Sequence, residues 1–282
     1  MLTAHVALVS EESKIKAGEL SKVAGALSKQ VSRDFGPLWT VTADVAAYDR
    51  LEDVPLDYWP IIVKDDIGDP SAAGYHEDKH GQPFALVQYD RSWSLTASHE
   101  CLEMLADPFG RRVIAGESPV KGQGRVNFLV EVCDPCEASD CAYTINGIQV
   151  SDFFTPNFFD PVASAGVRYS YTGALKAPRQ VLKDGYLSWY VPALKQWWQR
   201  TWFNAGKPSD GAIKNFNISG TNVRAAIDRR TEVDRAEAIA KASPSSRSMA
   251  RSSKERGERQ DPFASRAEFL REAIRAVSDK SK

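Results

Sequence analysis

Alternation of hydrophobic and polar residues divides the first part of the chain into strands and helices. Residues 5–9 form a short apolar run that predicts a strand. From residue 15 to residue 35 apolar residues recur every three or four positions, which predicts a long helix ended by Gly36 and Pro37. β-Branched and aromatic residues at 39–47 and 59–64 predict two further strands.

The next segments complete an alternating order of strands and helices. Residues 74–87, interrupted by Gly81 and Pro83, predict an irregular edge strand. Residues 95–107 predict a compact helix, with Ser94 or Thr96 as its N-cap and Pro108–Gly110 as its stop. The expected order is therefore strand, helix, strand, strand, edge strand, helix.

The second half of the folded part is expected to be rich in strands and aromatic residues. Residues 126–132 predict a buried strand, and Asn146-Gly147 predicts a hairpin within 143–153. Residues 186–203 hold four of the seven tryptophans. Packing in a core is the favoured role for this cluster, and a platform for sugars or nucleic-acid bases is the alternative. Gly, Asn and Ser dominate 204–222, which marks the end of the folded body.

The last 60 residues differ in composition from the rest. Two polar helices are predicted at about 225–242 and 265–277, around a low-complexity joint at 243–259. The narrow apolar stripe of the second suits docking on a partner or on the body, and a solvated extension is the alternative. We expect a body at 1–222, with subdomains 1–115 and 116–222, and a tail at 223–282.

Charge changes this picture more than overall composition does. The 282-residue chain carries a formal charge of −1, which argues against a general nucleic-acid binder. Split at residue 222, however, the body has an excess of six acidic residues and the tail an excess of five basic ones. The tail therefore stays open to a protein partner or to weak nucleic-acid binding. The sequence gives no indication of the oligomeric state.

Composition and the N-terminus bear on protein class and compartment. With 43% hydrophobic and 26% charged residues, wholesale disorder, a fibre and a long coiled coil are excluded. No apolar stretch approaches the roughly 18 residues of a membrane span, and residues 1–12 lack the features of a signal peptide. Four cysteines suggest reduced thiols, so the expectation is a soluble, cytoplasmic protein.

The predicted helix at 95–107 carries the sequence His99-Glu100-Cys101-Leu102-Glu103, an HExxE motif. On a helix, positions i and i+4 lie about 40° apart around the axis and about 6 Å along it, so His99 and Glu103 can bind one ion. Glu100 then flanks that ion, as does the glutamate of an HExxH zinc helix that takes a proton from the activated water. The alternative is an ordinary solvated pair of His99 and Glu103 on an amphipathic helix.

Several acidic residues are candidates for the remaining ligands. Asp107 lies about 12 Å beyond His99 along the helix, so it either orients a ligand or binds the following loop. A zinc site needs a third protein ligand, and Glu131 ranks first because an unpaired carboxylate in an apolar strand is costly to bury. Asp134 and then Glu137 follow as candidates in a turn. Exposure of Glu131 to solvent, or pairing with a residue such as Arg125, is the alternative.

Cysteines supply a second, weaker pattern. Cys133, Cys136 and Cys141 have the spacing of part of a structural zinc site, but no second pair follows, and buried free thiols are favoured. Cys101 lies within the motif, where any small residue suffices.

The motif Ser98-His-Glu-x-x-Glu-x-x-x-Asp-Pro108, with Glu131-Val-x-Asp134 downstream, resembles a gluzincin-like group of zincin metallopeptidases over about residues 1–159. The resemblance implies an α+β fold with a mixed sheet, a long N-terminal helix and an active-site helix. It implies that His99, Glu103 and Glu131 bind zinc and that Glu100 is the general base. It also implies that the edge strand at 74–87 aligns a peptide substrate through its backbone.

Chemistry at such a site would differ from that of an HExxH enzyme. One neutral histidine and two carboxylates leave a bound Zn²⁺ formally neutral, so water is acidified less, and we expect slower hydrolysis with a more alkaline optimum or use of Mn²⁺ or another divalent ion. Tyr143, Tyr169 and Tyr171 are the candidates for an oxyanion donor. The expected function is a zinc-dependent peptidase; the alternatives are a catalytically inactive structural or interaction protein and a nucleic-acid-associated protein, both using the tail.

Overall fold

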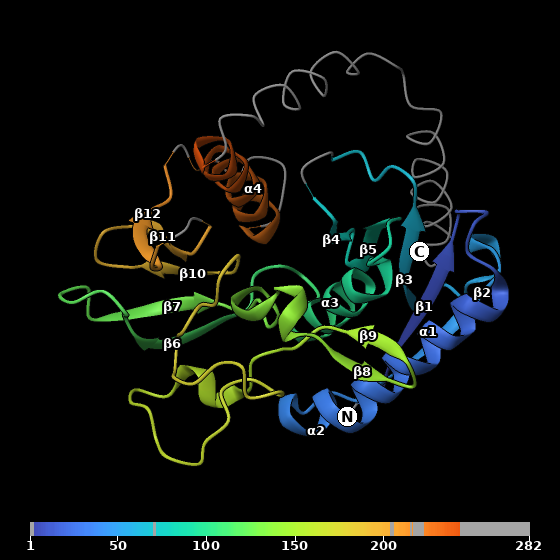
Figure 1. Ribbon diagram of the computed structural model, residues 1–282, viewed down its shortest axis with the longest axis horizontal. Coiled ribbons are helices and arrows are strands. Elements are labelled where there is room, and N and C mark those ends of the chain that lie inside the picture. The colour runs from blue at the N-terminus through green and yellow to red at the C-terminus, as the bar shows by residue number, and fades with distance from the viewer. Residues whose placement is uncertain (1–2, 70–71, 204–205, 215, 217–222, 243–282) are drawn as a thin grey trace, which may run out of the picture. The chain divides into compact units, whose positions relative to one another are not determined.

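The computed structural model describes residues 3–69, 72–203, 206–214, 216 and 223–242. Its main compact unit is Met1–Ala238; most of the second unit, Ile239–Lys282, lies outside the described residues. The main unit combines helices with two five-stranded sheets and one two-stranded sheet (Figure 1). The expected mixed α+β class is confirmed.

The first sheet is mixed and contains the N-terminal strands. Its order is β2-β1-β3-β5-β4, and every neighbouring pair is parallel except β4 and β5. The predicted edge strand at 74–87 is a hairpin, because His80 and Gly81 adopt positive φ angles of 52° and 81° that turn the chain. The strands are β1 (Ala4–Ser10), β2 (Ala43–Tyr48), β3 (Tyr58–Lys64), β4 (Gly74–Lys79) and β5 (Gln82–Gln88).

The long N-terminal helix continues past its predicted end. α1 (Ala17–Lys29) leads into a π-helical segment, η1 (Gln30–Phe35), and then α2 (Gly36–Trp39). The prediction that Gly36 and Pro37 end the helix is wrong, because Pro37 stands in the first turn of α2, where its missing N–H has no partner to lose. A Cβ on Gly36 would lie 2.5 Å from the carbonyl oxygen of Val41, so only glycine fits there.

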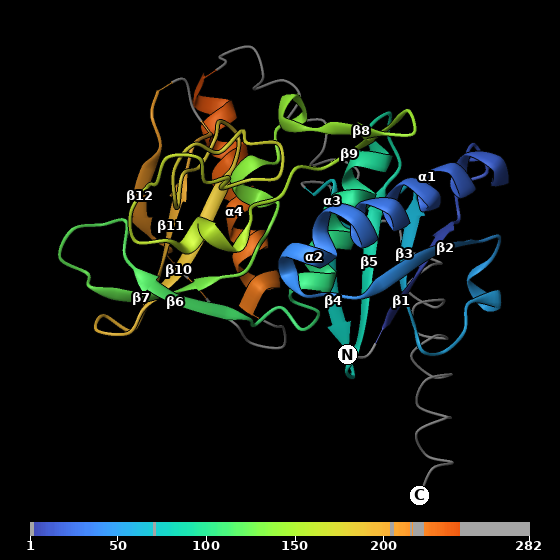
Figure 2. The same ribbon diagram turned by 90° about the horizontal axis from the view of Figure 1, so that it is seen from below.

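The helix that carries the HExxE motif is α3 (Trp93–Ala106). It packs on β3, β4 and β5 beside α1 (Figure 2). The Ser98 hydroxyl donates to Gln30 Oε1 at 2.7 Å and accepts from the Ser151 amide at 2.9 Å, which ties α3 to its neighbours. Most of its residues are buried, so α3 is a core helix rather than an amphipathic surface helix.

The second sheet is antiparallel and follows α3 in the chain. Its order is β12-β11-β10-β7-β6, and Trp189 on β10 is fully buried, which agrees with the favoured packing role of the tryptophan cluster. The predicted hairpin at Asn146-Gly147 forms β8 (Tyr143–Ile145) and β9 (Ile148–Val150). The strands of the second sheet are β6 (Val113–Glu117), β7 (Arg125–Leu129), β10 (Tyr186–Val191), β11 (Gln196–Thr201) and β12 (Ser209–Ala212).

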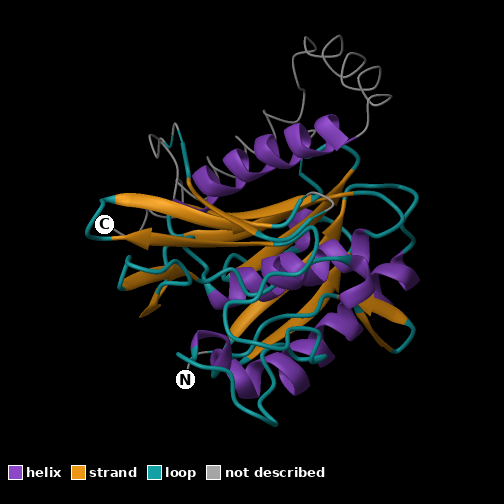
Figure 3. Cartoon of the chain, turned by 60° about the vertical axis from the view of Figure 1, so that its left-hand side comes forward, coloured by secondary structure: helices purple, strands orange, loops and turns teal. Residues whose placement is uncertain are grey.

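The last described helix, α4 (Val223–Ala242), begins one residue after the expected end of the body. It lies across the second sheet (Figure 3), where Tyr186 donates to Asp228 and Gln199 donates to the Thr231 hydroxyl at 2.7 Å. The expected boundary at 222/223 therefore falls inside the compact unit, which runs to Ala238. The predicted joint at 243–259 and helix at 265–277 lie outside the described residues.

Short 3₁₀ turns connect these elements, at η2 (Leu51–Asp53), η3 (Asp134–Cys136), η4 (Ser139–Cys141) and η5 (Pro156–Phe159). The turn η3 follows β7 closely and brings Asp134 back toward α3. None of the described helices combines the length and the apolar character needed to cross a membrane.

Candidate metal centre

The two motif residues one turn apart on α3 face the same point. His99 Nε2 lies 3.4 Å from Glu103 Oε1, and both atoms face the turn η3. There His99 Nε2 lies 3.1 Å from Asp134 Oδ1. One nitrogen and two carboxylate oxygens from distant parts of the sequence thus form a three-membered group of potential ligands.

Burial excludes the alternative of a solvated surface pair. Glu103 is fully buried, and the side chain of His99 is only 14% exposed. Burial alone raises the pKa of the Glu103 carboxyl, but the charges of Arg224 and His99 outweigh it and bring the pKa below its ordinary value. Burial lowers the pKa of His99, and the Glu103 charge together with Asp134 raises it well above its ordinary value.

The structure brings Asp134, rather than Glu131, against His99 and Glu103. The turn that carries Asp134 is held by close packing: a Cβ on Gly185 would lie 2.5 Å from the Asp134 carbonyl oxygen. The amide of Cys133 donates to Glu103 Oε1 at 3.1 Å, and its thiol to the His99 carbonyl oxygen at 3.8 Å. Backbone and side-chain contacts of one turn therefore fix the relative positions of all three potential ligands.

Glu131 lies next to this group rather than in it. β7 ends at Leu129, so Glu131 follows the strand instead of standing inside it. It is 1% exposed, which excludes the solvent-facing alternative, and it groups with Asp134 and Asp228. Burial and the charges of Asp134 and Asp228 raise its pKa well above the ordinary value.

Glu100, the expected general base, lies on the side of α3 that faces β4. Its Oε2 is 3.4 Å from Nδ1 of His76, a fully buried histidine of β4. β4 approaches α3 this closely because Gly74 has no side chain: a Cβ there would lie 2.7 Å from Thr96 Cγ2 and 3.1 Å from Glu100 Oε1. Glu100, Glu103 and His76 form a second group of potential ligands.

An arginine from α4 lies between these carboxylates. The Arg224 guanidinium, in a residue that is 2% exposed, donates to Glu103 Oε2 through Nη2, and its Nη1 is 3.2 Å from Asp228 Oδ2. It also donates to the His76 carbonyl oxygen at 3.3 Å. Arg224 binds the oxygen of Glu103 that faces away from His99, so it does not occupy the space between the three potential ligands.

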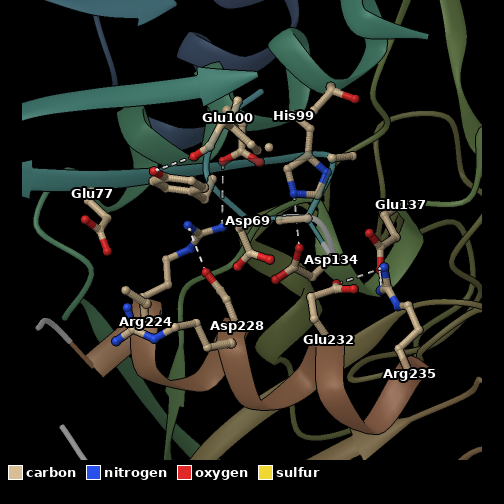
Figure 4. Close-up of a pocket in the computed structure, with 18 of the residues that line it drawn as sticks. Asp69, Glu77, His99, Glu100, Asp134, Glu137, Arg224, Asp228, Glu232 and Arg235 are labelled. Atoms are coloured by element: carbon tan, nitrogen blue, oxygen red, sulfur yellow. Dashed lines mark hydrogen bonds and ion pairs between the residues drawn. The ribbon is translucent and has the colours of Figure 1, made fainter. Parts of the chain in front are cut away.

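A pocket of about 440 Å³ is lined by five of these residues: His99, Glu100, Asp134, Arg224 and Asp228. In Figure 4, the side chains of His99 and Glu100 extend into the pocket from α3. The opposite side is formed by side chains of α4, namely Arg224, Asp228, Glu232 and Arg235. The rim includes β4 residues from Gly74 to Glu77. The pocket therefore gives solvent access to His99 and Asp134, and it borders β4 at the edge of the first sheet.

The spacing and chemistry of the three donor atoms fit a divalent metal ion. Ligand atoms about 2.0–2.1 Å from a tetrahedral zinc ion lie roughly 3.3 Å from each other. The separations of 3.4 Å and 3.1 Å match that value. One imidazole and two carboxylates also form a donor set that zinc and manganese accept. His99, Glu103 and Asp134 are therefore the residues that can hold an ion.

The other acidic residues singled out from the sequence have separate roles. Asp107 Oδ2 accepts from the Arg112 amide at 2.7 Å, the bond into the following loop that was one of two expectations for it. Glu137 lines the pocket but pairs with Arg235 of α4. Burial raises the pKa of Glu137 to about 8, although the charge of Arg235 acts in the opposite direction.

The cysteines and the three expected oxyanion donors lie elsewhere. All four cysteines are free thiols, and Cys101, Cys133 and Cys136 are buried. The hydroxyls of Tyr143 and Tyr171 both donate to Asp34, at 3.0 and 2.7 Å, and the Tyr169 hydroxyl accepts from a backbone amide. None of the three tyrosines lines the described pocket, whose tyrosines are Tyr75 and Tyr186. The structure thus does not bring the predicted donors to the site.

Three residues of this site, His76, Arg224 and Asp228, were not predicted from the sequence. His76 stood in a segment predicted as an edge strand, where a single histidine carries no motif. Arg224 and Asp228 stood in the presumed tail, and 121 residues separate Arg224 from Glu103. The one available signal was the i, i+4 spacing of Arg224 and Asp228 on a predicted helix, which is common on solvated surfaces.

Comparison of the chain with protein-family models, curated proteins and solved structures finds no match. Function is therefore inferred from the geometry of the pocket and its side chains.

Proposed function

We propose that the protein is a metal-dependent hydrolase that acts on peptides. The observation that carries the proposal is the convergence of His99, Glu103 and Asp134 at ligand spacing, with His99 and Asp134 on the wall of an open pocket. Glu100 lies one residue from the first ligand and lines the same pocket. A bound divalent ion, zinc or a harder ion such as manganese, would supply a nucleophile by lowering the pKa of a water molecule.

Glu100 has the surroundings of a general base. Its carboxylate lies 3.4 Å from His76 Nδ1 and 4.0 Å from Arg224 Nη2, and both groups hold it in place. Its Oε2 makes no hydrogen bond within the described part of the chain, so a lone pair remains for a proton. The role that we assign to Glu100 is to take the proton of the attacking water.

The first sheet supports a peptide as substrate. β4 is antiparallel to β5, pairs with no other described strand and borders the pocket beside α3. The edge of such a strand can bind an extended peptide by backbone hydrogen bonds where it is free; on β4 the His76 carbonyl oxygen already accepts from Arg224. This sheet order, with its antiparallel edge strand next to the HExxE helix, supports the zincin-like resemblance that the motif first suggested.

Replacement of Glu100 by glutamine tests the proposal. The amide keeps the size of the side chain but cannot take a proton, so Glu100→Gln is expected to abolish peptide hydrolysis while the protein retains its metal. Glu117→Gln, an exposed change on β6, is the matched control and should retain full activity. Hydrolysis by Glu100→Gln at the wild-type rate would reject the assigned base.

The position of Arg224 favours a second candidate, a catalytically inactive protein on the same scaffold. The guanidinium already gives Glu103 a cationic partner, so the carboxylate has charge compensation without a metal ion. This candidate predicts no stoichiometric metal in the purified protein and no change of melting temperature with a chelator. Loss of stability with a chelator would contradict this candidate.

A further inference from the structure

Three carboxylates lie together beside the candidate metal centre, with which they share Asp134. Glu131 follows β7, Asp134 stands in η3, and Asp228 extends from α4. One oxygen of each lies within 4.8 Å of the other two. Asp134 belongs both to this group and to the group of His99 and Glu103.

Glu131 has no hydrogen-bond partner for its carboxylate among the described residues. It is 1% exposed, and neither of its oxygens makes a hydrogen bond in the described part of the chain. The same holds for Asp134 Oδ2, the oxygen not used toward His99. A buried carboxylate without hydrogen bonds is strongly disfavoured unless a cation binds it or a proton neutralises it.

Arg224 does not fill that role. Its Nε is 4.0 Å from Glu131 Oε1, too far for a hydrogen bond, and it likewise has no hydrogen-bond partner among the described residues. The hydrogen bonds of its guanidinium go instead to Glu103 and to the His76 carbonyl oxygen. Among the described residues, no protein cation therefore hydrogen-bonds to Glu131, and its two oxygens lack a hydrogen-bond partner.

The net negative charge of the whole cluster also favours a second cation. The three overlapping groups of potential ligands contain five carboxylates, and Arg224 is the cation among them. One divalent ion at His99 would leave two uncompensated negative charges in a largely buried site. A second divalent ion would bring the cluster to neutrality when all five carboxylates are ionised.

We propose that Glu131, Asp134 and Asp228 bind a second divalent cation, with Asp134 bridging the two ions through Oδ1 and Oδ2. The inference rests on the proposed function for the ion at His99 and extends that site from one ion to two. Three carboxylates without an imidazole favour a hard ion, Mn²⁺ or Mg²⁺, over zinc. Asp134 and Asp228 both line the pocket, which gives the ion a route of entry (Figure 4).

Binding of Mn²⁺ to the full chain, measured by equilibrium dialysis and electron paramagnetic resonance, tests the second site. Wild type is expected to bind two equivalents with a spin-coupled signal, because carboxylate-bridged ions lie about 3.5–4 Å apart. Asp228→Asn and Glu131→Gln are each expected to bind one equivalent with an uncoupled signal. Asp234→Asn, a more exposed change on the same helix, is the control and should bind two.

The outcomes separate this inference from the proposed function. His99→Ala removes only the first ion, so it too should bind one equivalent. A single equivalent in wild type that His99→Ala removes and Asp228→Asn leaves would overturn the second site and keep the first. A single equivalent that Asp228→Asn removes and His99→Ala leaves would keep the carboxylate site and overturn the proposed centre. Absence of binding would overturn both. Because Asp228 also pairs with Arg224, Glu131→Gln decides if Asp228→Asn does not melt cooperatively.

Discussion

Replacement of Arg224 by methionine should destabilise the metal-free protein and make its stability depend on metal. Methionine keeps a long unbranched side chain but leaves Glu103, which is fully buried, without its guanidinium partner. Removing one partner of a buried ion pair costs about 3–5 kcal/mol. For a domain of this size each kcal/mol lowers the melting temperature by roughly 2–4 °C, so a decrease of about 6–20 °C is expected.

A divalent ion should restore more stability to this variant than to wild type. Arg224 contacts one oxygen of Glu103, and the ion is proposed to bind the other, so the guanidinium repels the ion in wild type. Removal of that repulsion makes metal binding tighter, and tighter binding gives a larger stabilisation at the same metal concentration.

Thermal melting of both proteins, in chelator and in excess zinc, measures the two effects. Arg229→Met, an exposed change on the same helix, is the matched control and should alter stability by less than about 0.5 kcal/mol. Equal melting of wild type and Arg224→Met in chelator would refute the assigned charge compensation. Equal stabilisation of the two proteins by zinc would refute the idea that Arg224 and the metal ion both contact the Glu103 carboxylate.

Four further predictions concern the scaffold. The carboxylate of Asp34 accepts from Tyr171 at 2.7 Å; burial raises its pKa, but its ionic and hydrogen-bonding partners bring the pKa below the ordinary 3.8. Asp34→Ala should therefore lower the unfolding free energy by about 1.5–3 kcal/mol at neutral pH, and urea titrations should show the difference shrinking as pH falls from 3.8 through the lower folded-state pKa. Gly74→Ala should cost about 1–3 kcal/mol and reduce hydrolysis, because its Cβ would collide with α3. Gly25→Ala, at an exposed position of α1, should instead raise the unfolding free energy by about 0.5–1 kcal/mol in the same titration. A lower unfolding free energy would show that the open space around Gly25 is filled. Trp189→Ala should cost about 3–5 kcal/mol in chemical denaturation, and a cost below 1 kcal/mol would contradict its place in the core.

Elements with strong local patterns were predictable from the sequence. The strands β1 and β3, the helix α3 and the hairpin at Asn146-Gly147 were all predicted within a few residues of their bounds. Each has a period or a turn signal that neighbouring residues determine. The end of α1 was not predictable in this way, because Gly36 and Pro37 break a helix or begin the next one depending on how the following chain packs.

Residues of the candidate site were predictable only where they share one helix. His99, Glu100 and Glu103 came from a motif whose geometry is that of α3 itself. On the sequence alone, Glu131 ranked above Asp134 because burying an unpaired charge is costly, but both residues are buried and the cost applies to each. The turn at Pro135 determines that Asp134, and not Glu131, faces His99. His76 and Arg224 reach the cluster through tertiary packing, for which no local pattern exists.

The most direct test is the content of divalent metal, zinc and manganese included, in the purified full chain, measured by elemental analysis for wild type and for His99→Ala side by side. The assignment of His99, Glu103 and Asp134 as ligands predicts at least one equivalent of divalent metal in wild type and one equivalent less in His99→Ala. Wild-type protein without a stoichiometric divalent metal, or a metal content unchanged by His99→Ala, would contradict the proposed metal centre.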